Sequence, residues 1–156
     1  MRHLLLLLLS VIGLAAAETK RCVFCEIVAG QREQAAVYRD DKVMAFMTIG
    51  PVNPGHVLVI PLVHADNYLE VQPEALGAML AAAQRIGRAL QLTDLNAEGI
   101  QLLMNTGRAA GQTVFHAHLH VIPRHTGDSG IEQKSEAPRP TMAELEAVAA
   151  KIRVKL

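Results

Sequence analysis

The sequence predicts a single α+β domain, because segments with strand and helix patterns follow one another without a Ser- or Gly-rich linker. Its 156 residues are enough for one compact domain and few for two. The formal net charge of zero gives no general attraction to nucleic acid or to an anionic membrane, and the lack of Trp argues against a base-stacking platform. We therefore expect a small-molecule site and no nucleic-acid partner, with any anionic ligand held by local groups.

The N-terminus has the pattern of a secretory signal. A basic start at Arg2 and His3 precedes an apolar run that ends in Ala15-Ala16-Ala17 and is too short to span a bilayer comfortably. We expect residues 1–17 to be cleaved and residues 18–156 to form an exported or periplasmic domain with no stable membrane association. The alternatives are an uncleaved anchor and a cytoplasmic protein whose start is misassigned.

Three strands are expected in the first half of the chain. Val37-Tyr38 and the segment from Lys42 to Thr48 flank an Asp40-Asp41 turn. The segment from His56 to Ile60 is apolar, rich in β-branched residues and bounded on both sides by proline. We expect these three segments to be neighbours in one sheet.

Two helices are expected. Pro73-Glu74 opens the first, since proline suits the first helical turn, and its apolar residues recur at helical spacing. This stripe is expected to be core rather than a site: Leu76, Met79, Leu80, Ala83, Ile86, Gly87 and Leu90. A capping box from Thr141 to Glu144 starts the second helix, which runs to about Val154 with Leu145, Val148 and Ile152 facing inward. The polar segment 126–139 before it is expected to be a mobile surface loop.

The most informative segment follows a fourth expected strand, from Ile100 to Met104, and a glycine-containing loop. His116, His118 and His120 stand at i, i+2 and i+4 in an apolar run, so a strand there would place them on one face. The opposite face would carry Phe115, Ala117, Leu119 and Val121. Three histidines on one face each need a hydrogen-bond partner or a ligand, and near neutral pH imidazole can be a nucleophile, a proton carrier or a metal ligand. The segment therefore predicts a reactive centre.

Cys22 and Cys25 are the only cysteines, and their spacing is that of half a metal knuckle. A closed zinc site needs four ligands, so two histidines distant in sequence must complete it. The candidates are His64 and His116, with His56, His120 and His125 as competitors, and spacing alone does not choose among them. A disulfide between the two cysteines is the open alternative for an exported protein.

Three segments together resemble the histidine triad (HIT) family: Cys22 to Ile27, Pro54 to Pro61, and Gly111 to Ile122. The likeness covers about residues 20–125 and is strongest to the zinc-bearing bacterial members, which are related to Hint-type phosphoramidases and Fhit-type dinucleoside polyphosphate hydrolases. It implies a HIT-like fold, with a five-stranded antiparallel sheet and packed helices, in which two protomers usually pair into a homodimer through a continuous sheet.

The resemblance also implies roles for single residues. His118 matches the nucleophile, which attacks the α-phosphorus of a nucleotide and forms a covalent nucleotidyl-imidazole, and His120 and His56 match the flanking histidines. Positions that contact phosphate oxygens or the leaving group match Asn105, Gln112 and Thr113, and Gln112 is counted with the catalytic residues. Backbone N–H groups from Gly111 onward are expected to stabilise charge on the phosphate oxygens. The structural zinc ligands match Cys22, Cys25, His64 and His116, which favours zinc over the disulfide.

Thr48 departs from the family pattern, because many relatives carry Asp or Asn there to bind the ribose hydroxyls. We therefore expect loose recognition of the sugar. The resemblance as a whole implies a nucleotide hydrolase or transferase that acts at the α-phosphate of a purine nucleotide derivative, such as a nucleoside phosphoramidate or a dinucleoside polyphosphate. One alternative is a zinc-stabilised nucleotide-binding module with little turnover. A third alternative, a metallohydrolase that uses His116, His118 and His120 as metal ligands, has less support, because no carboxylate lies in that segment to act as a base or ligand.

Overall fold

The computed structural model describes residues 22–128 and 138–156. The signal-like segment 1–17 and most of the expected loop 126–139 lie outside the described residues. The elements in chain order are α1 (Val23–Val28), β1 (Ala36–Arg39), β2 (Val43–Met47), β3 (Val57–Pro61), the 3-10 helix η1 (Tyr68–Glu70), α2 (Pro73–Gln91), β4 (Gly99–Leu103), the 3-10 helix η2 (Arg108–Ala110), β5 (Leu119–Arg124) and α3 (Met142–Arg153).

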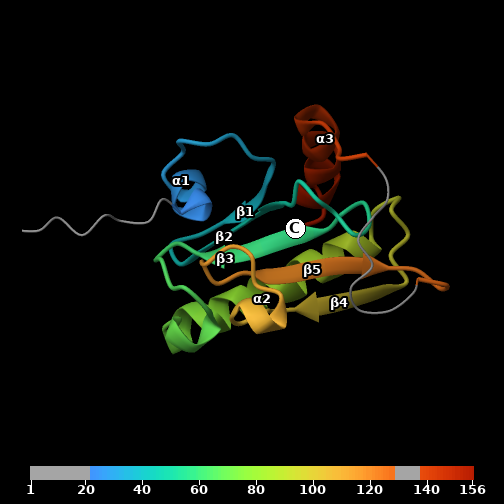
Figure 1. The fold of residues 1–156 in the computed structure, drawn as a ribbon. Helices are drawn as coiled ribbons and strands as arrows, with labels where there is room; N and C mark the ends of the chain where they lie inside the picture. Colours follow the sequence, from blue (N-terminus) through green and yellow to red (C-terminus); the bar gives the residue numbers. More distant parts are fainter. Residues whose placement is uncertain (1–21, 129–137) are drawn as a thin grey trace, which may run out of the picture.

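The five strands form one antiparallel sheet in the order β1-β2-β3-β5-β4 (Figure 1). This confirms the expected α+β class and the five-stranded antiparallel sheet. The expected strands agree with β1 to β4 within two residues at each end, and both expected helices are present. Within the described part of the chain, no helix is both long enough and apolar enough to cross a membrane.

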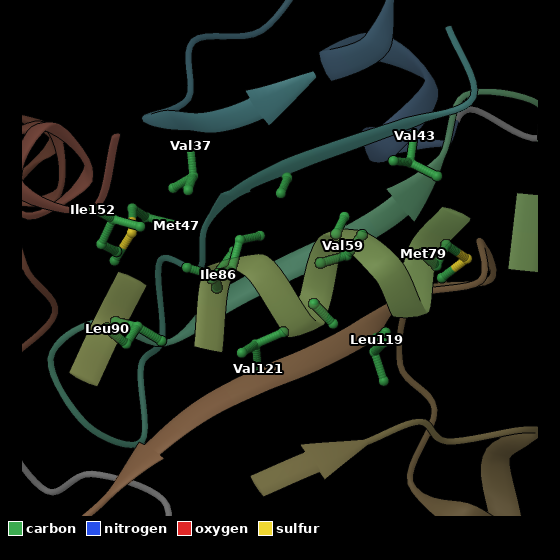
Figure 2. Close-up of a cluster of buried hydrophobic side chains, with 14 of the residues drawn as sticks. Val37, Val43, Met47, Val59, Met79, Ile86, Leu90, Leu119, Val121 and Ile152 are labelled. Carbon is green, nitrogen blue, oxygen red and sulfur yellow. The ribbon is translucent and has the colours of Figure 1, made fainter. Parts of the chain in front are cut away.

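Helices α2 and α3 cover one face of the sheet, where the larger core cluster lies (Figure 2). Strand β2 is buried along its whole length because both of its faces are covered. Its residues Val43, Ala45 and Met47 belong to the larger cluster, while Met44 and Phe46 belong to a second cluster with Phe24 and Ile27 of α1. The sheet is therefore packed between α2 and α3 on one side and α1 on the other.

The buried stripe of α2 differs from the prediction at three positions. Leu80 is 50% exposed, whereas Ala82 and Ala89 are buried. Alanine has a small side chain, so α2 can pack closely on the sheet at these two positions. The buried face of α2 therefore includes alanines in place of the larger Leu80. Helix α1 was not predicted, because the pattern of Cys22 and Cys25 was interpreted as a metal knuckle alone.

The histidine segment is not one continuous strand, and this part of the prediction was wrong. Strand β5 begins at Leu119, so His116 and His118 precede it in irregular backbone. The chain there is held outside the ladder, since the N–H of Ala117 donates to the carbonyl of Ala65 at 2.7 Å. Ala117, Leu119 and Val121 do enter the core, but Phe115 is only half-buried and lies under the Arg108 guanidinium.

A glycine fixes the turn that leads into β3. Gly55 has φ +93°, and a Cβ atom there would lie 2.8 Å from side-chain carbons of both Leu90 and Leu95. Nearby, the Asn53 amide donates to the Pro123 carbonyl at 2.9 Å, so the loop before β3 is tied to the end of β5. The residue after Gly55 is His56, whose position therefore depends on this close approach.

Candidate active site and metal centre

His118, His120 and His56 form a row on the α1 side of the sheet. His120 pairs with Leu58 across the β3–β5 ladder, and Leu58 belongs to the core cluster under α1. Nε2 of His56 lies 2.9 Å from Nδ1 of His120. The rings of His118 and His120 have centroids 5.0 Å apart. The predicted catalytic histidines are thus brought together, although only His120 lies within a strand.

Backbone groups determine which nitrogen of each ring carries the proton. The N–H of Val52 donates to Nδ1 of His56 at 3.1 Å, so this nitrogen is an acceptor. Neutral His56 then carries its proton on Nε2 and donates it to Nδ1 of His120. His120 is left with its own proton on Nε2, which faces away from His56.

His118 is oriented by the carbonyl of His116. Nδ1 of His118 lies 2.7 Å from this oxygen, and since a carbonyl can only accept, Nδ1 must donate. The Nε2 atom therefore keeps its lone pair, which is the requirement for a nucleophile. The Phe24 ring packs edge-on against His118 with centroids 5.4 Å apart, a contact that the sequence reasoning missed.

Burial keeps the row uncharged near neutral pH. Loss of solvation lowers the pKa of His56 to about 3, with a further contribution from His120. The same cause lowers the pKa of His120 to about 4. Burial also lowers the pKa of His118, although its hydrogen bond to the His116 carbonyl acts in the opposite direction. A neutral imidazole at His118 is therefore the ground state at pH 7.

Beside this row, Cys22, Cys25, His64 and His116 converge with their ligand atoms all within 4.8 Å of one another. The Sγ–Nδ1 distances are 3.4 Å for Cys22–His116, 3.3 Å for Cys25–His64 and 3.6 Å for Cys25–His116. The two Nδ1 atoms are 3.3 Å apart. Around a tetrahedral zinc ion, ligand atoms lie about 3.6 Å apart for a sulfur and a nitrogen and about 3.3 Å apart for two nitrogens. The distances between these ligand atoms therefore fit zinc.

The remaining ring nitrogens of this cluster support the same geometry. Nε2 of His116 donates to the carbonyl of Pro61 at 3.0 Å, and Nε2 of His64 lies 3.0 Å from a carboxylate oxygen of Asp66. Both contacts place the proton on Nε2 and leave Nδ1 free to bind a metal, as outer partners of zinc-binding histidines do. Pro61 and Asp66 were not predicted, because their role depends on contacts that sequence spacing does not show.

Both cysteines are free thiols in the structure rather than a disulfide. Burial and the neighbouring Cys22 raise the pKa of Cys25 to about 11, so a cation is needed to stabilise the thiolate form. The competing histidines His56, His120 and His125 are not part of this cluster, and His118 is not part of it either. A metal held by His116, His118 and His120 together, as in the metallohydrolase alternative, therefore has no support.

The loop before the histidine segment is held by a buried glutamine. Nε2 of Gln112 donates to the carbonyls of Asp66 at 2.5 Å and Val114 at 3.0 Å, and its Oε1 accepts from the N–H of Gly107 at 2.8 Å. The side chain is 2% exposed, and these contacts direct its amide into the loop. Gly111 ends η2 with φ +86°, a conformation that suits glycine.

The other predicted substrate contacts lie nearer to solvent. Thr113 is exposed, and Asn105 is half-buried after the end of β4. Thr48 is half-buried just after β2, and its N–H donates to the carbonyl of His56 at 3.2 Å. The backbone of Thr48 therefore lies next to that of His56, and the role of Thr48 in ribose recognition stays a prediction.

Comparison with known proteins agrees with this arrangement. The HIT domain family model matches residues 29–127. An uncharacterized HIT-like protein of Mycobacterium tuberculosis is 46% identical over 107 residues, which cover 69% of this chain and 74% of that protein. Adenylylsulfatase HINT3 of Arabidopsis thaliana is 36% identical over 107 residues, covering 69% of this chain and 54% of that protein.

A solved structure carries the same fold together with zinc. The crystal structure of a Zn-bound histidine triad family protein from Mycobacterium smegmatis has a TM-score of 0.75 and 36% identity, covering 86% of this chain and 91% of that one. The segment matched by the family model, 29–127, contains the row His56, His118 and His120. The chain therefore belongs to the histidine triad (HIT) family.

Proposed function

We propose that this protein is a nucleotide hydrolase or transferase that acts at the α-phosphate of a purine nucleotide derivative through a covalent nucleotidyl-His118. The observation that carries the proposal is the 2.7 Å contact between Nδ1 of His118 and the carbonyl of His116, because it leaves Nε2 unprotonated. Membership of a family that includes an adenylylsulfatase supports the enzymatic reading.

The reaction has two displacements. The lone pair on Nε2 of His118 forms a bond to the α-phosphorus, and the bond from phosphorus to the leaving group breaks. The positive charge that develops on the ring is stabilised by the hydrogen bond from Nδ1 to the His116 carbonyl. Water then attacks phosphorus, the bond to Nε2 breaks, and the nucleoside monophosphate leaves.

The neighbours of His118 assist in binding and proton transfer. His120 presents an Nε2–H group to the site because its Nδ1 accepts from His56. The loop at Thr113 is proposed to contact phosphate oxygens, whereas the N–H of Gly111 donates to the carbonyl of Arg108 at 3.0 Å, and Gln112 positions this loop from within. Gln112 thus acts as a positioning residue rather than through direct contact with the phosphate.

Zinc is proposed to be held by Cys22, Cys25, His64 and His116, the set of the tetrahedral cluster. With four protein ligands the metal has no open position for water, so its contribution is structural. The Zn-bound relative of Mycobacterium smegmatis supports this assignment. The metal would fix residue 116, and with it the carbonyl that orients His118.

The test is a substrate panel with the purified protein: adenosine and guanosine phosphoramidates, adenylyl sulfate and dinucleoside polyphosphates. We expect turnover of at least one class, and an acid-labile nucleotidyl adduct on His118 when the reaction is quenched in base. Tight nucleotide binding without turnover or adduct would replace the enzyme by a zinc-stabilised binding module.

Two further properties are part of the proposal. Strand β4 is at the edge of the sheet and carries Leu102, which is 47% exposed, so a second copy could extend the sheet into a homodimer. Light scattering on the wild type and on Leu102→Lys tests this, and a monomeric wild type would refute it. Export through cleavage of residues 1–17 is tested by N-terminal sequencing of the native protein, and retention of Met1 would contradict it.

A further inference from the structure

Three consecutive residues after β3, His64, Ala65 and Asp66, contact both the metal cluster and the chain that precedes β5. We call them the 64–66 segment. The Nδ1 atom of His64 belongs to the metal cluster. The carbonyl of Ala65 accepts from the N–H of Ala117 at 2.7 Å, and the carbonyl of Asp66 accepts from Nε2 of Gln112. The 64–66 segment therefore joins the metal cluster to two points of the chain before β5.

The contact with Ala65 bears directly on the nucleophile. The carbonyl of His116 and the N–H of Ala117 belong to one planar peptide group, so the two move together. The N–H donates to the carbonyl of Ala65, and the carbonyl accepts from Nδ1 of His118. Ala65 and Ala117 are both buried in the larger core cluster, so water does not compete for the bond between them. The position of Ala65 therefore sets the orientation of the group that accepts from His118.

The contact with Asp66 bears on the phosphate loop. The carbonyls of Asp66 and Val114 both accept from the amide nitrogen of Gln112, whose oxygen accepts from the N–H of Gly107. Gln112 is buried, so its amide has no replacement partner in water if Asp66 moves away. The loop that contains Thr113 is therefore held in place by the main chain of the 64–66 segment.

The carboxylate of Asp66 determines how His64 is held. One of its oxygens lies 3.0 Å from Nε2 of His64, and the N–H of Asp66 donates to a carboxylate oxygen of Glu70 at 3.2 Å. The side chains of His64 and Asp66 are 43% and 53% exposed, so the pair contributes little to the stability of the fold by itself. A carboxylate on the outer nitrogen of a metal-binding histidine fixes the ring, and its loss weakens metal binding by about 10–100-fold.

We propose that Asp66 is a positioning residue for the reaction at His118, and that it acts by holding His64 on the metal. This inference rests on the proposed function. When the ring of His64 is fixed in the metal cluster, the carbonyls of Ala65 and Asp66 are fixed with it, because they follow it directly in the chain. The peptide group of His116 is then held from two sides, by its own side chain in the metal cluster and by the carbonyl of Ala65. Asp66 itself contacts no reacting atom.

The first experiment titrates zinc into the wild type and three variants in the presence of a competing chelator. Asp66→Ala should lower the affinity for zinc by about 10–100-fold. Asp66→Asn keeps an oxygen that accepts from Nε2 of His64, so its affinity should stay within severalfold of that of the wild type. Asn67→Ala is the matched control, because the Asn67 side chain caps η1 by accepting from the N–H of Leu69 and lies outside the metal cluster. It should bind zinc like the wild type.

The second experiment follows hydrogen exchange at the N–H of Ala117, together with kcat. In the wild type, zinc should slow this exchange. At a zinc concentration that fills the wild type but not Asp66→Ala, the variant should exchange faster at Ala117 and have a lower kcat. Saturating zinc should restore both properties, because a bound metal then holds the ring of His64 without the carboxylate.

Two outcomes of the titration would overturn the inference: an unchanged zinc affinity in Asp66→Ala, or an equal loss in Asn67→Ala. A loss of kcat that saturating zinc does not restore, or an exchange rate at Ala117 that is independent of zinc, would overturn it as well. No turnover of any substrate by the wild type would instead refute the proposed function, while zinc affinity and hydrogen exchange would still show whether Asp66 holds the 64–66 segment.

Discussion

Nε2 of His56 lies 2.9 Å from Nδ1 of His120, and the backbone N–H of Val52 occupies the other nitrogen of His56. Because a backbone N–H can only donate, the hydrogen bond between the two histidines has a fixed direction. His120 is thereby held as the tautomer that presents Nε2–H. The loop that contains Val52 thus influences the active site through two rings, without contact with a reacting atom.

Replacement of His118 by Ala is predicted to abolish turnover while the fold persists. The loss in kcat should be roughly a thousandfold or more, since no other ring in the row has its Nε2 lone pair prepared by a backbone carbonyl. Zinc content should be unchanged, because His118 is not in the metal cluster. Steady-state kinetics, metal analysis and a melting curve check this, and substantial activity in the variant would eliminate His118 as the nucleophile.

Replacement of both Cys22 and Cys25 by Ser is predicted to release zinc and to lower the melting temperature sharply. Metal binding contributes directly to folding free energy when the ligands come from distant segments, here the first turn of α1, the loop after β3 and the irregular segment before β5. Metal analysis and calorimetry measure both effects. His125→Ala is the control, since His125 lies outside the cluster and its loss should leave the metal bound. A metal-free wild type with a disulfide between the cysteines would contradict the prediction.

The stability of the protein is predicted to fall in acid because of the buried row. Burial lowers the pKa of His56 to about 3 and that of His120 to about 4, whereas both titrate near 6.5 in the unfolded chain. Below pH 6.5 the unfolded state therefore binds more protons, and stability is lost as pH falls toward 4, by on the order of 1 kcal/mol per pH unit for each histidine. Above pH 6.5 these two groups add no pH dependence.

Urea denaturation of the wild type and of His120→Asn between pH 7 and pH 5 measures this effect. The variant should lose less stability over that range than the wild type, because one of the two buried histidines is gone. Release of metal in acid affects both proteins alike, so their difference isolates His120. Parallel pH curves would show that His120 is not held neutral by its surroundings.

Thr48→Asp is predicted to improve kcat/KM for ribonucleotide substrates and to leave 2′-deoxynucleotides nearly unchanged. The N–H of Thr48 donates to the carbonyl of His56, so the main chain of Thr48 is fixed next to His56. An ionised carboxylate can accept from both ribose hydroxyls, and each charge-assisted hydrogen bond contributes about 1.5–3 kcal/mol. Paired kinetics on adenosine and 2′-deoxyadenosine substrates measure the ratio, and equal effects on both would place the sugar elsewhere.

Gly55→Ala is predicted to destabilise the fold by about 1–3 kcal/mol or more, because the added methyl group would approach Leu90 and Leu95 to 2.8 Å. Gly30→Ala is a matched control, since Gly30 also has positive φ, at +72°, but has nothing within 4 Å of its Cβ position. The difference in unfolding free energy between the two variants therefore measures the steric contact alone. If the two variants are equally stable, the loop is not tightly packed on α2.

Most of the fold could be predicted because apolar residues recur along the sequence at the spacing of a β-strand or of an α-helix. The sequence did not predict where β5 begins, since that depends on the contact of Ala117 with Ala65 outside the ladder. The six-residue α1 was missed because it is too short for a clear apolar stripe and carries Cys25. Periodicity thus located the elements, while contacts between distant backbone atoms determined their ends.

The sequence indicated which residues belong to the candidate site but not which groups each of them contacts. Spacing left five histidines open as metal ligands, and only the folded geometry selects His64 and His116. Gln112 was expected to face the phosphate, yet its amide is bonded to the carbonyl of Asp66, which is 46 positions earlier in the chain. Such long-range contacts to backbone atoms leave no pattern in a single sequence.

The group that orients His118 is the main-chain carbonyl of residue 116, and every amino acid carries that atom. Substitution of the side chain at this position removes a metal ligand but not the hydrogen-bond acceptor. Over evolutionary time, descendants of this protein could exchange or lose their metal ligands one at a time while natural selection maintained the nucleophile. Loss of a metal ligand therefore leaves the acceptor of His118 in the chain, although the proposed metal no longer fixes its position.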